Sequence, residues 1–272
     1  MEKFQLLAYL TINGIGSASG IVHYDNSLYI ISDNSSYLYE YQISEDHLHK
    51  IALVENPQEN IVKKDKLDFE ALTLKNNKLH IIGSGSTKNR NRTFSYHLQN
   101  KKIKEKDVSL LYQNIKTKFN ISDDDLNIEG ALFAGKDLLL FQRGNGANSK
   151  NGIIKLGFEP DEINFFPIQL PKIKHVETSF TDAILVNDTI YFLAAAEDTT
   201  STYEDGEVLG TIIGSIDLKT FQLEKSLQIT NKHKFEGITF YQKNKEELTF
   251  LLCEDNDTEE LNATIYMLKL KI

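Results

Sequence analysis

The chain has 272 residues, with 39 acidic and 30 basic side chains and a formal net charge of −9 at pH 7. This acidic balance argues against non-specific binding to nucleic acid, because a phosphate backbone attracts the opposite charge. The single cysteine, Cys253, excludes an intrachain disulfide and a multi-cysteine zinc site.

The N-terminal segment shows no basic region followed by a long apolar stretch, so it does not predict a secretory leader. No run of about 18 apolar residues predicts a transmembrane helix. We therefore expect a cytoplasmic protein that contacts neither membrane nor nucleic acid. A processed secretory or lipoprotein precursor is the alternative.

A short motif recurs five times along the chain. It places a carboxylate or a serine before a small residue and an apolar run. The repeated polar residues are 51 to 59 positions apart, and the interval across the two termini is of the same size. They are Ser19, Glu70, Glu129, Asp182 and Glu236. A repeat of this length is typical of β-propeller blades.

Each motif is followed by further apolar runs of strand length, separated by polar turns. The second runs are residues 28–31, 79–82, 138–141, 190–193 and 248–252. The third runs are residues 38–43, 93–98, 152–156, 211–216 and 263–268. The fourth runs are residues 51–54, 108–112, 165–170 and 226–229. The fifth repeat ends without a fourth run, and the N-terminal residues 4–10 supply one.

These runs predict an all-β fold, a five-bladed β-propeller with four antiparallel strands per blade, whose last blade is closed by the N-terminal strand. We expect one domain over residues 1–272, with at most a helical turn in residues 56–66 and 115–125. A pair of β-sandwiches is the alternative, but it does not explain the repeated acidic position.

Equivalent positions on the first strands of a propeller form a ring around the central channel. That level holds four carboxylates and one hydroxyl, and the four carboxylates would repel one another and raise one another's pKa values unless a cation neutralised them. Ca²⁺ suits such a ring because it takes six to eight oxygen ligands in flexible geometry. We therefore expect Ca²⁺ to be held by Ser19, Glu70, Glu129, Asp182 and Glu236. The alternative is that these acids brace the inner strands around water.

The turns after the second strands surround the same mouth of the channel. Glycine-rich turns and several arginines gather there, which favours binding of a small anionic molecule such as a phosphate. The candidate substrate-binding residues are Asp33, Ser84, Ser86, Arg92, Arg143, Asn145, Glu197 and Glu254.

Four ring residues and the Phe235–Ile238 motif resemble the soluble calcium-activated apyrases. That family consists of five-bladed propellers with a central calcium held by serine and glutamate, and Ser19, Glu70, Glu129 and Glu236 match its ring. Asp182 departs from it, since a serine is usual in that repeat.

The Glu-Gly pairs at 129–130 and 236–237 are similar to those of phytase-like esterases and SdiA-regulated propellers. The motifs at 68–72 (Asp-Phe-Glu-Ala-Leu), 83–86 (Gly-Ser-Gly-Ser) and 143–145 (Arg-Gly-Asn) resemble an uncharacterised bacterial propeller family most closely. Membership of that family implies the fold and no established activity.

Three functions are consistent with these residues. The first is a calcium-dependent phosphoester hydrolase in which Glu70, Glu129 and Arg143 are the catalytic residues. The second is a non-catalytic propeller that binds a ligand or an unknown protein with the same face. The third is a glycoside hydrolase, which needs two suitably spaced carboxylates. We expect a monomer.

Overall fold

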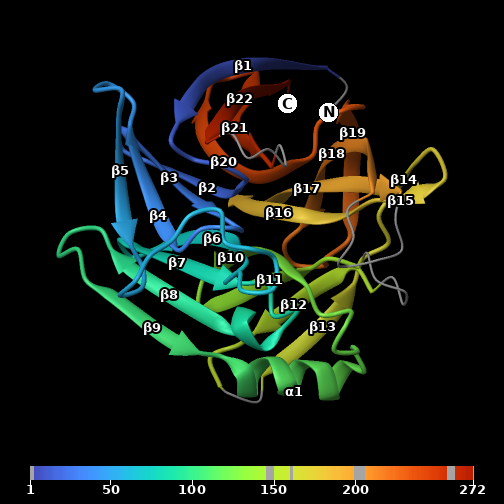
Figure 1. Ribbon diagram of the computed structural model, residues 1–272. Helices are drawn as coiled ribbons and strands as arrows, with labels where there is room; N and C mark the ends of the chain where they lie inside the picture. Colours follow the sequence, from blue (N-terminus) through green and yellow to red (C-terminus); the bar gives the residue numbers. More distant parts are fainter. Residues whose placement is uncertain (1–2, 145–149, 160–161, 199–205, 256–260, 272) are drawn as a thin grey trace.

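The computed structural model describes residues 3–144, 150–159, 162–198, 206–255 and 261–271. Five four-stranded antiparallel sheets surround a common axis (Figure 1). Blade 1 contains β2 (Ala18–Tyr24), β3 (Ser27–Ser32), β4 (Tyr37–Gln42) and β5 (His47–Ala52). Blade 2 contains β6 (Phe69–Lys75), β7 (Lys78–Gly83), β8 (Arg92–His97) and β9 (Ile103–Asp107). Blade 3 contains β10 (Ile128–Ala134), β11 (Asp137–Gln142), β12 (Gly152–Leu156) and β13 (Ile163–Pro167).

The last two blades complete the circle. Blade 4 contains β16 (Ser179–Val186), β17 (Thr189–Asp198), β18 (Glu207–Asp217) and β19 (Leu223–Thr230). Blade 5 contains β20 (Phe235–Lys243), β21 (Glu247–Glu254), β22 (Asn262–Lys271) and β1 (Phe4–Asn13). The N-terminal β1 pairs with β22 and forms the outer strand of blade 5. The predicted five-bladed propeller and its closure by the N-terminal strand are confirmed.

The innermost strands β2, β6, β10, β16 and β20 contact one another in cyclic order. Alternate side chains of each strand pack between neighbouring blades, where aromatic rings fill much of the space. Phe180, for example, contacts Phe141 of blade 3 and Phe192 of its own blade, with ring centroids 5.3 and 5.2 Å apart. These interblade layers hold the inner strands, and therefore the channel, in fixed positions.

One predicted strand was wrong. Residues 108–112 belong mainly to the helix α1 (Ser109–Phe119), and β9 ends at Asp107. Val108, Tyr112 and Ile115 recur at helical spacing and are buried against blades 2 and 3, a period that a five-residue window does not show. The helix begins earlier than the turn expected in residues 115–125, and no helix forms in residues 56–66.

Two short elements lie outside the blades. They are the 3₁₀ turn η1 (Lys88–Arg90) and the hairpin of β14 (Lys172–Ile173) and β15 (Val176–Glu177). No helix in the described part of the chain is long and apolar enough to cross a membrane.

Candidate functional site

A β-bulge lies near the start of every inner strand. The pairing register with the second strand skips one residue in each blade, and a skipped residue leaves the ladder and re-aims its side chain. The skipped residues are Ser19, Glu70, Glu129, Thr181 and Glu236. Five equivalent bulges therefore define the ring that the sequence repeat predicted, with three carboxylates and two hydroxyls.

The position predicted for Asp182 was wrong by one residue. The bulge of blade 4 is at Thr181, and Asp182 follows it at the position of Gly20, Ala71, Gly130 and Gly237 in the other blades. The Asp182 carboxylate is buried and accepts hydrogen bonds from the N–H groups of Ala183 (2.7 Å) and Ile238 (2.8 Å). Burial, partly opposed by these bonds, raises its pKa well above the usual value. Asp182 thus joins β16 to β20 rather than lining the ring.

The two hydroxyls of the ring connect neighbouring blades. Thr181 donates a hydrogen bond to the carbonyl oxygen of Phe235 (2.7 Å), and Ser19 donates one to the carbonyl oxygen of Phe69. In both cases the acceptor is the residue before the ring member of the next blade. Because these hydroxyls donate to the backbone, their role in the described structure is to fix the inner strands.

The ring opens into a small polar cavity of about 80 Å³. Six carboxylates and five cationic side chains line it, so their formal charges nearly cancel. The lining residues are Asp33, Lys63, Lys66, Asp68, Glu70, Arg90, Asn127, Glu129, Arg143, Lys234, Glu236 and Asp255. We call this space the central pocket.

On one side of the central pocket, cationic side chains form ion pairs with two of the three ring glutamates. Arg143 donates to Glu129 (2.9 Å) and to Glu197, and its exposed side-chain fraction is 9%. Lys234 lies 2.9 Å from Glu197 and 2.8 Å from Glu236. These five side chains form a continuous buried ionic network, so two of the three ring carboxylates have cationic partners.

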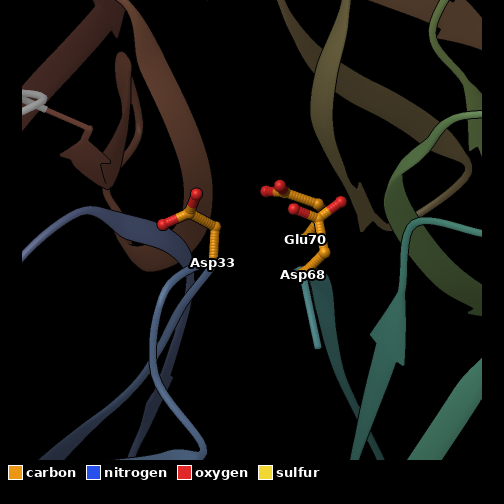
Figure 2. A group of neighbouring side chains, drawn as sticks. All are labelled: Asp33, Asp68 and Glu70. Atoms are coloured by element: carbon orange, nitrogen blue, oxygen red, sulfur yellow. The ribbon is translucent and has the colours of Figure 1, made fainter. Parts of the chain in front are cut away.

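The opposite side of the central pocket holds three carboxylates that face a common space (Figure 2). One oxygen from each of Asp33, Asp68 and Glu70 lies within 4.8 Å of the other two. The Oδ1 atom of Asp33 is buried and has no hydrogen-bond partner among the described residues. The Glu70 carboxylate likewise accepts no hydrogen bond and makes no ion pair within the described ranges. We call these residues the carboxylate trio.

The other oxygens of the trio are partly satisfied. Asp68 accepts hydrogen bonds from Arg90 (2.8 Å) and from Ser84, and Asp33 Oδ2 accepts one from Lys66. Asp68 has a φ of 54°, a conformation that is uncommon outside glycine and is often found at functional sites.

The pKa values reflect this division of the central pocket. Burial, then repulsion from Glu129 and Asp68, raises the pKa of Glu70 well above its usual value. Burial, then repulsion from Asp255, raises the pKa of Asp33 to about 7 although Lys66 opposes this. Burial would also raise the pKa of Glu197, but Arg143 and Lys234 outweigh it and lower that pKa to about 2. In the trio the charged forms of Glu70 and Asp33 are therefore disfavoured as long as no further cation is present, whereas the charged form of Glu197 is stabilised.

The low pKa of Glu197 predicts a pH-dependent contribution to stability. A carboxylate whose folded pKa is below its unfolded value of 4.5 stabilises the fold above pH 4.5, and this stabilisation is lost as the pH falls from 4.5 toward about 2. The shift corresponds to about 3 kcal/mol. We expect Glu197→Gln to unfold more easily in urea at pH 7 by about that amount, with the gap to wild type narrowing at pH 3. A gap that is constant with pH would contradict this. Glu105→Gln, on the exposed outer face, is the control.

The predicted substrate-binding residues lie in several environments. Asp33 and Arg143 line the central pocket, and Ser84 and Ser86 contact Asp68 and Arg90 at its edge. Glu197 belongs to the buried ionic network. Arg92 lies away from the pocket, where it pairs with Glu105 at 3.2 Å on the exposed outer strands. Asn145 lies outside the described residues.

Glu254 does not line the central pocket. It accepts hydrogen bonds from Tyr266 (2.6 Å) and bonds to His233 (2.7 Å), so it fixes side chains within and beside blade 5. Its neighbour Asp255 lies at the pocket instead.

Two side chains of the pocket that share a repeat position were not predicted from the sequence. Asp68 and Lys234 lie two residues before Glu70 and Glu236, immediately before β6 and β20 begin, and all four side chains line the central pocket. A polar residue stands two positions before every ring residue, and this regularity could have predicted Asp68 and Lys234. Lys66 was also missed, because it reaches the pocket from the loop between β5 and β6. Arg90 is one of the arginines expected at the mouth of the channel, and it reaches the pocket from a 3₁₀ turn.

Five bulged inner strands and an ionic pocket at one end of their channel define a five-bladed β-propeller with a buried charged site on its axis. The chain belongs to the family of unknown function DUF6929, whose model matches residues 14–270. This agrees with the expected uncharacterised propeller family, while the comparisons give no support for the apyrase, phytase-like or SdiA-regulated resemblances. A search of curated protein sequences gave no match.

Solved structures share the architecture at low sequence identity. The major allergen Mala s 1 of Malassezia sympodialis has a TM-score of 0.60 and 8% identity, with 95% of each chain covered. Glutaminyl cyclase of Myxococcus xanthus has a TM-score of 0.54 and 11% identity, covering 98% of this chain and 97% of its own. A luciferin-regenerating enzyme has a TM-score of 0.51 and 12% identity, covering 98% and 95%. At such identities the similarity shows the fold alone.

Proposed function

We propose that the protein binds Ca²⁺ at the carboxylate trio and hydrolyses a small phosphate ester in the central pocket. The observation that carries the proposal is the trio itself, with an unpartnered buried oxygen on Asp33 and an unpaired carboxylate on Glu70. Two oxygens on opposite sides of a calcium ion at about 2.4 Å are about 4.8 Å apart, so the trio is compatible with one shared ion. All donors are oxygens, as a hard cation prefers.

The charges around the pocket support a cation as the first ligand. Arg143 is occupied by Glu129 and Glu197, and Arg90 is occupied by Asp68 and Ser86, so an anion alone would have to displace existing partners. Within the trio, by contrast, Glu70 has no ion-pair partner among the described residues, and one oxygen of Asp33 has no hydrogen-bond partner. A divalent cation would turn the formal charge of the pocket lining positive, and a positive pocket attracts an anionic substrate.

Bound calcium would polarise a phosphoryl oxygen and lower the pKa of a coordinated water. The residues of the chain would then position the reactants: Asp33, Asp68 and Glu70 hold the cation, while Arg143 keeps Glu129 directed at the axis. The cavity of about 80 Å³ has room for a few water-sized groups, so only the reacting group of a substrate enters it. Two structurally similar proteins are named as enzymes, which is in keeping with a catalytic role for this fold.

The test is calcium binding by purified, chelator-treated protein. We expect a saturable heat of binding for Ca²⁺ in calorimetry, and a stabilisation of about 2.7 kcal/mol at a Ca²⁺ concentration 100 times Kd. Mg²⁺ should bind more weakly, because it demands a tighter octahedron. Absence of both effects would overturn the proposal.

The reaction is tested separately by phosphate release from aryl phosphates and nucleotides, with Ca²⁺ or with chelator. Calcium-dependent release supports hydrolysis. Calcium binding without turnover would contradict the catalytic half of the proposal and favour a binding module. Cleavage of aryl glycosides in the absence of metal would favour the alternative function of a glycoside hydrolase.

A further inference from the structure

A lysine bonds to one member of the carboxylate trio. Lys66 belongs to the loop between β5 and β6, and its ammonium donates a hydrogen bond to Asp33 Oδ2. Burial alone would lower the pKa of Lys66, but attraction by Asp33, then by Glu70 and Asp68, outweighs it and raises the pKa. The ammonium therefore lies beside the three carboxylates drawn in Figure 2 and is bonded to one of them, Asp33.

The loop that carries Lys66 is fastened to the blades beside the pocket. The N–H of Ile61 donates to the carbonyl oxygen of Asn34 (2.8 Å), and Arg90 donates to the carbonyl oxygen of Lys63 (3.2 Å). The backbone thus holds the lysine close to the trio. Its side chain has an exposed fraction of 18%, so the mouth of the pocket lies open beside it.

Lysine and a divalent cation would bind the same carboxylate, that of Asp33. An ammonium is a compact charge on a flexible four-carbon stem, so it can leave a site by side-chain rotation without moving the backbone. While it bonds to Asp33, that carboxylate cannot give both oxygens to a metal ion, and the positive charge repels an incoming cation.

We propose that Lys66 is an internal competitor that sets the calcium affinity of the central pocket. This inference rests on the proposed calcium site. The ammonium neutralises Asp33 when no metal is bound, and it turns to solvent when the ion enters. The observed affinity for Ca²⁺ is then the intrinsic affinity multiplied by the fraction of molecules in which the ammonium leaves the site open.

The test compares Lys66→Met with Lys64→Met, an exposed lysine of the same loop. We expect calorimetry to show a Kd for Ca²⁺ about 10- to 100-fold lower in Lys66→Met, if the site is open in about 1–10% of wild-type molecules. Lys64→Met should bind as wild type does. In chelator, Lys66→Met should melt below wild type, because Asp33 has lost its partner. Saturating Ca²⁺ should bring the two melting temperatures together, because the ion has then displaced the ammonium from Asp33 in wild type.

The measured Kd values distinguish the role of Lys66 as a competitor from the existence of the calcium site. Equal Kd values for wild type and Lys66→Met would overturn the competitor while leaving the site in place. A weaker affinity in Lys66→Met would also overturn it, by showing that the lysine orients the ligands. If neither protein binds Ca²⁺ while both remain folded in circular dichroism, the calcium site itself is wrong.

Discussion

Arg143→Met is expected to lower the free energy of unfolding by about 3–5 kcal/mol, because removing one partner of a buried ionic network leaves its other charges unpaired. Arg143 bonds to Glu129 and Glu197, whose exposed side-chain fractions are 3% and 7%. Methionine fills similar space and cannot donate. For a chain of this size the loss corresponds to a melting temperature lower by about 6–20 °C.

The matched control is Arg92→Met. Arg92 pairs with Glu105, and both side chains are nearly half exposed, so the same substitution should cost less than about 1 kcal/mol. Arg143→Lys should recover part of the stability, since one ammonium cannot reproduce the forked contacts to two carboxylates. Equal effects of Arg143→Met and Arg92→Met in urea unfolding would show that the buried network does not stabilise the propeller.

Glu70→Gln is expected to raise the Kd for Ca²⁺ by about 100-fold or more, because calcium affinity depends strongly on the number of charged oxygen ligands. Glutamine keeps the shape of the side chain and one carbonyl oxygen. Since Glu70 makes no ion pair within the described ranges and burial raises its pKa, the neutral variant should be at least as stable as wild type without metal. Binding is measured by calorimetry and stability by thermal melting in chelator.

Glu105→Gln provides the matched control for this variant, since it removes a carboxylate from the outer face of the same blade. It should leave the calcium Kd unchanged. If Glu70→Gln binds Ca²⁺ as tightly as wild type while Asp33→Asn and Asp68→Asn do not, the ion lies elsewhere in the pocket. If all three bind normally, the carboxylate trio is not the site.

Much of the fold could be predicted from the sequence because a propeller repeats one local pattern. Each blade has to bury its own four strands with alternating apolar residues, so the runs, turns and ring motif recur at nearly equal spacing. The closure by residues 4–13 also followed, since the fifth repeat lacks a fourth run. The first part of the helix α1 was predicted as a strand because its buried residues share the apolar character of a strand, and only their spacing distinguishes it.

The ring was predicted to within one residue in one blade. In four blades the bulged residue is the predicted one, whereas in blade 4 the more conspicuous Asp182 was chosen over Thr181. A carboxylate is the more obvious ligand by type, but register decides which face of a strand a side chain occupies, and a shift of one residue reverses it.

Sequence by itself determined the number of blades, the closure of the circle and the gathering of acids on one axis, because these follow from local periodicity. Only the tertiary structure decided which acids are already neutralised. Arg143 and Lys234 pair with Glu129 and Glu236, while Asp33, Asp68 and Glu70 share a space beside Lys66. These partners come from four blades and a loop. Charges as far apart in the sequence as Asp33 and Glu236, 203 residues, meet only after the blades have packed around the axis.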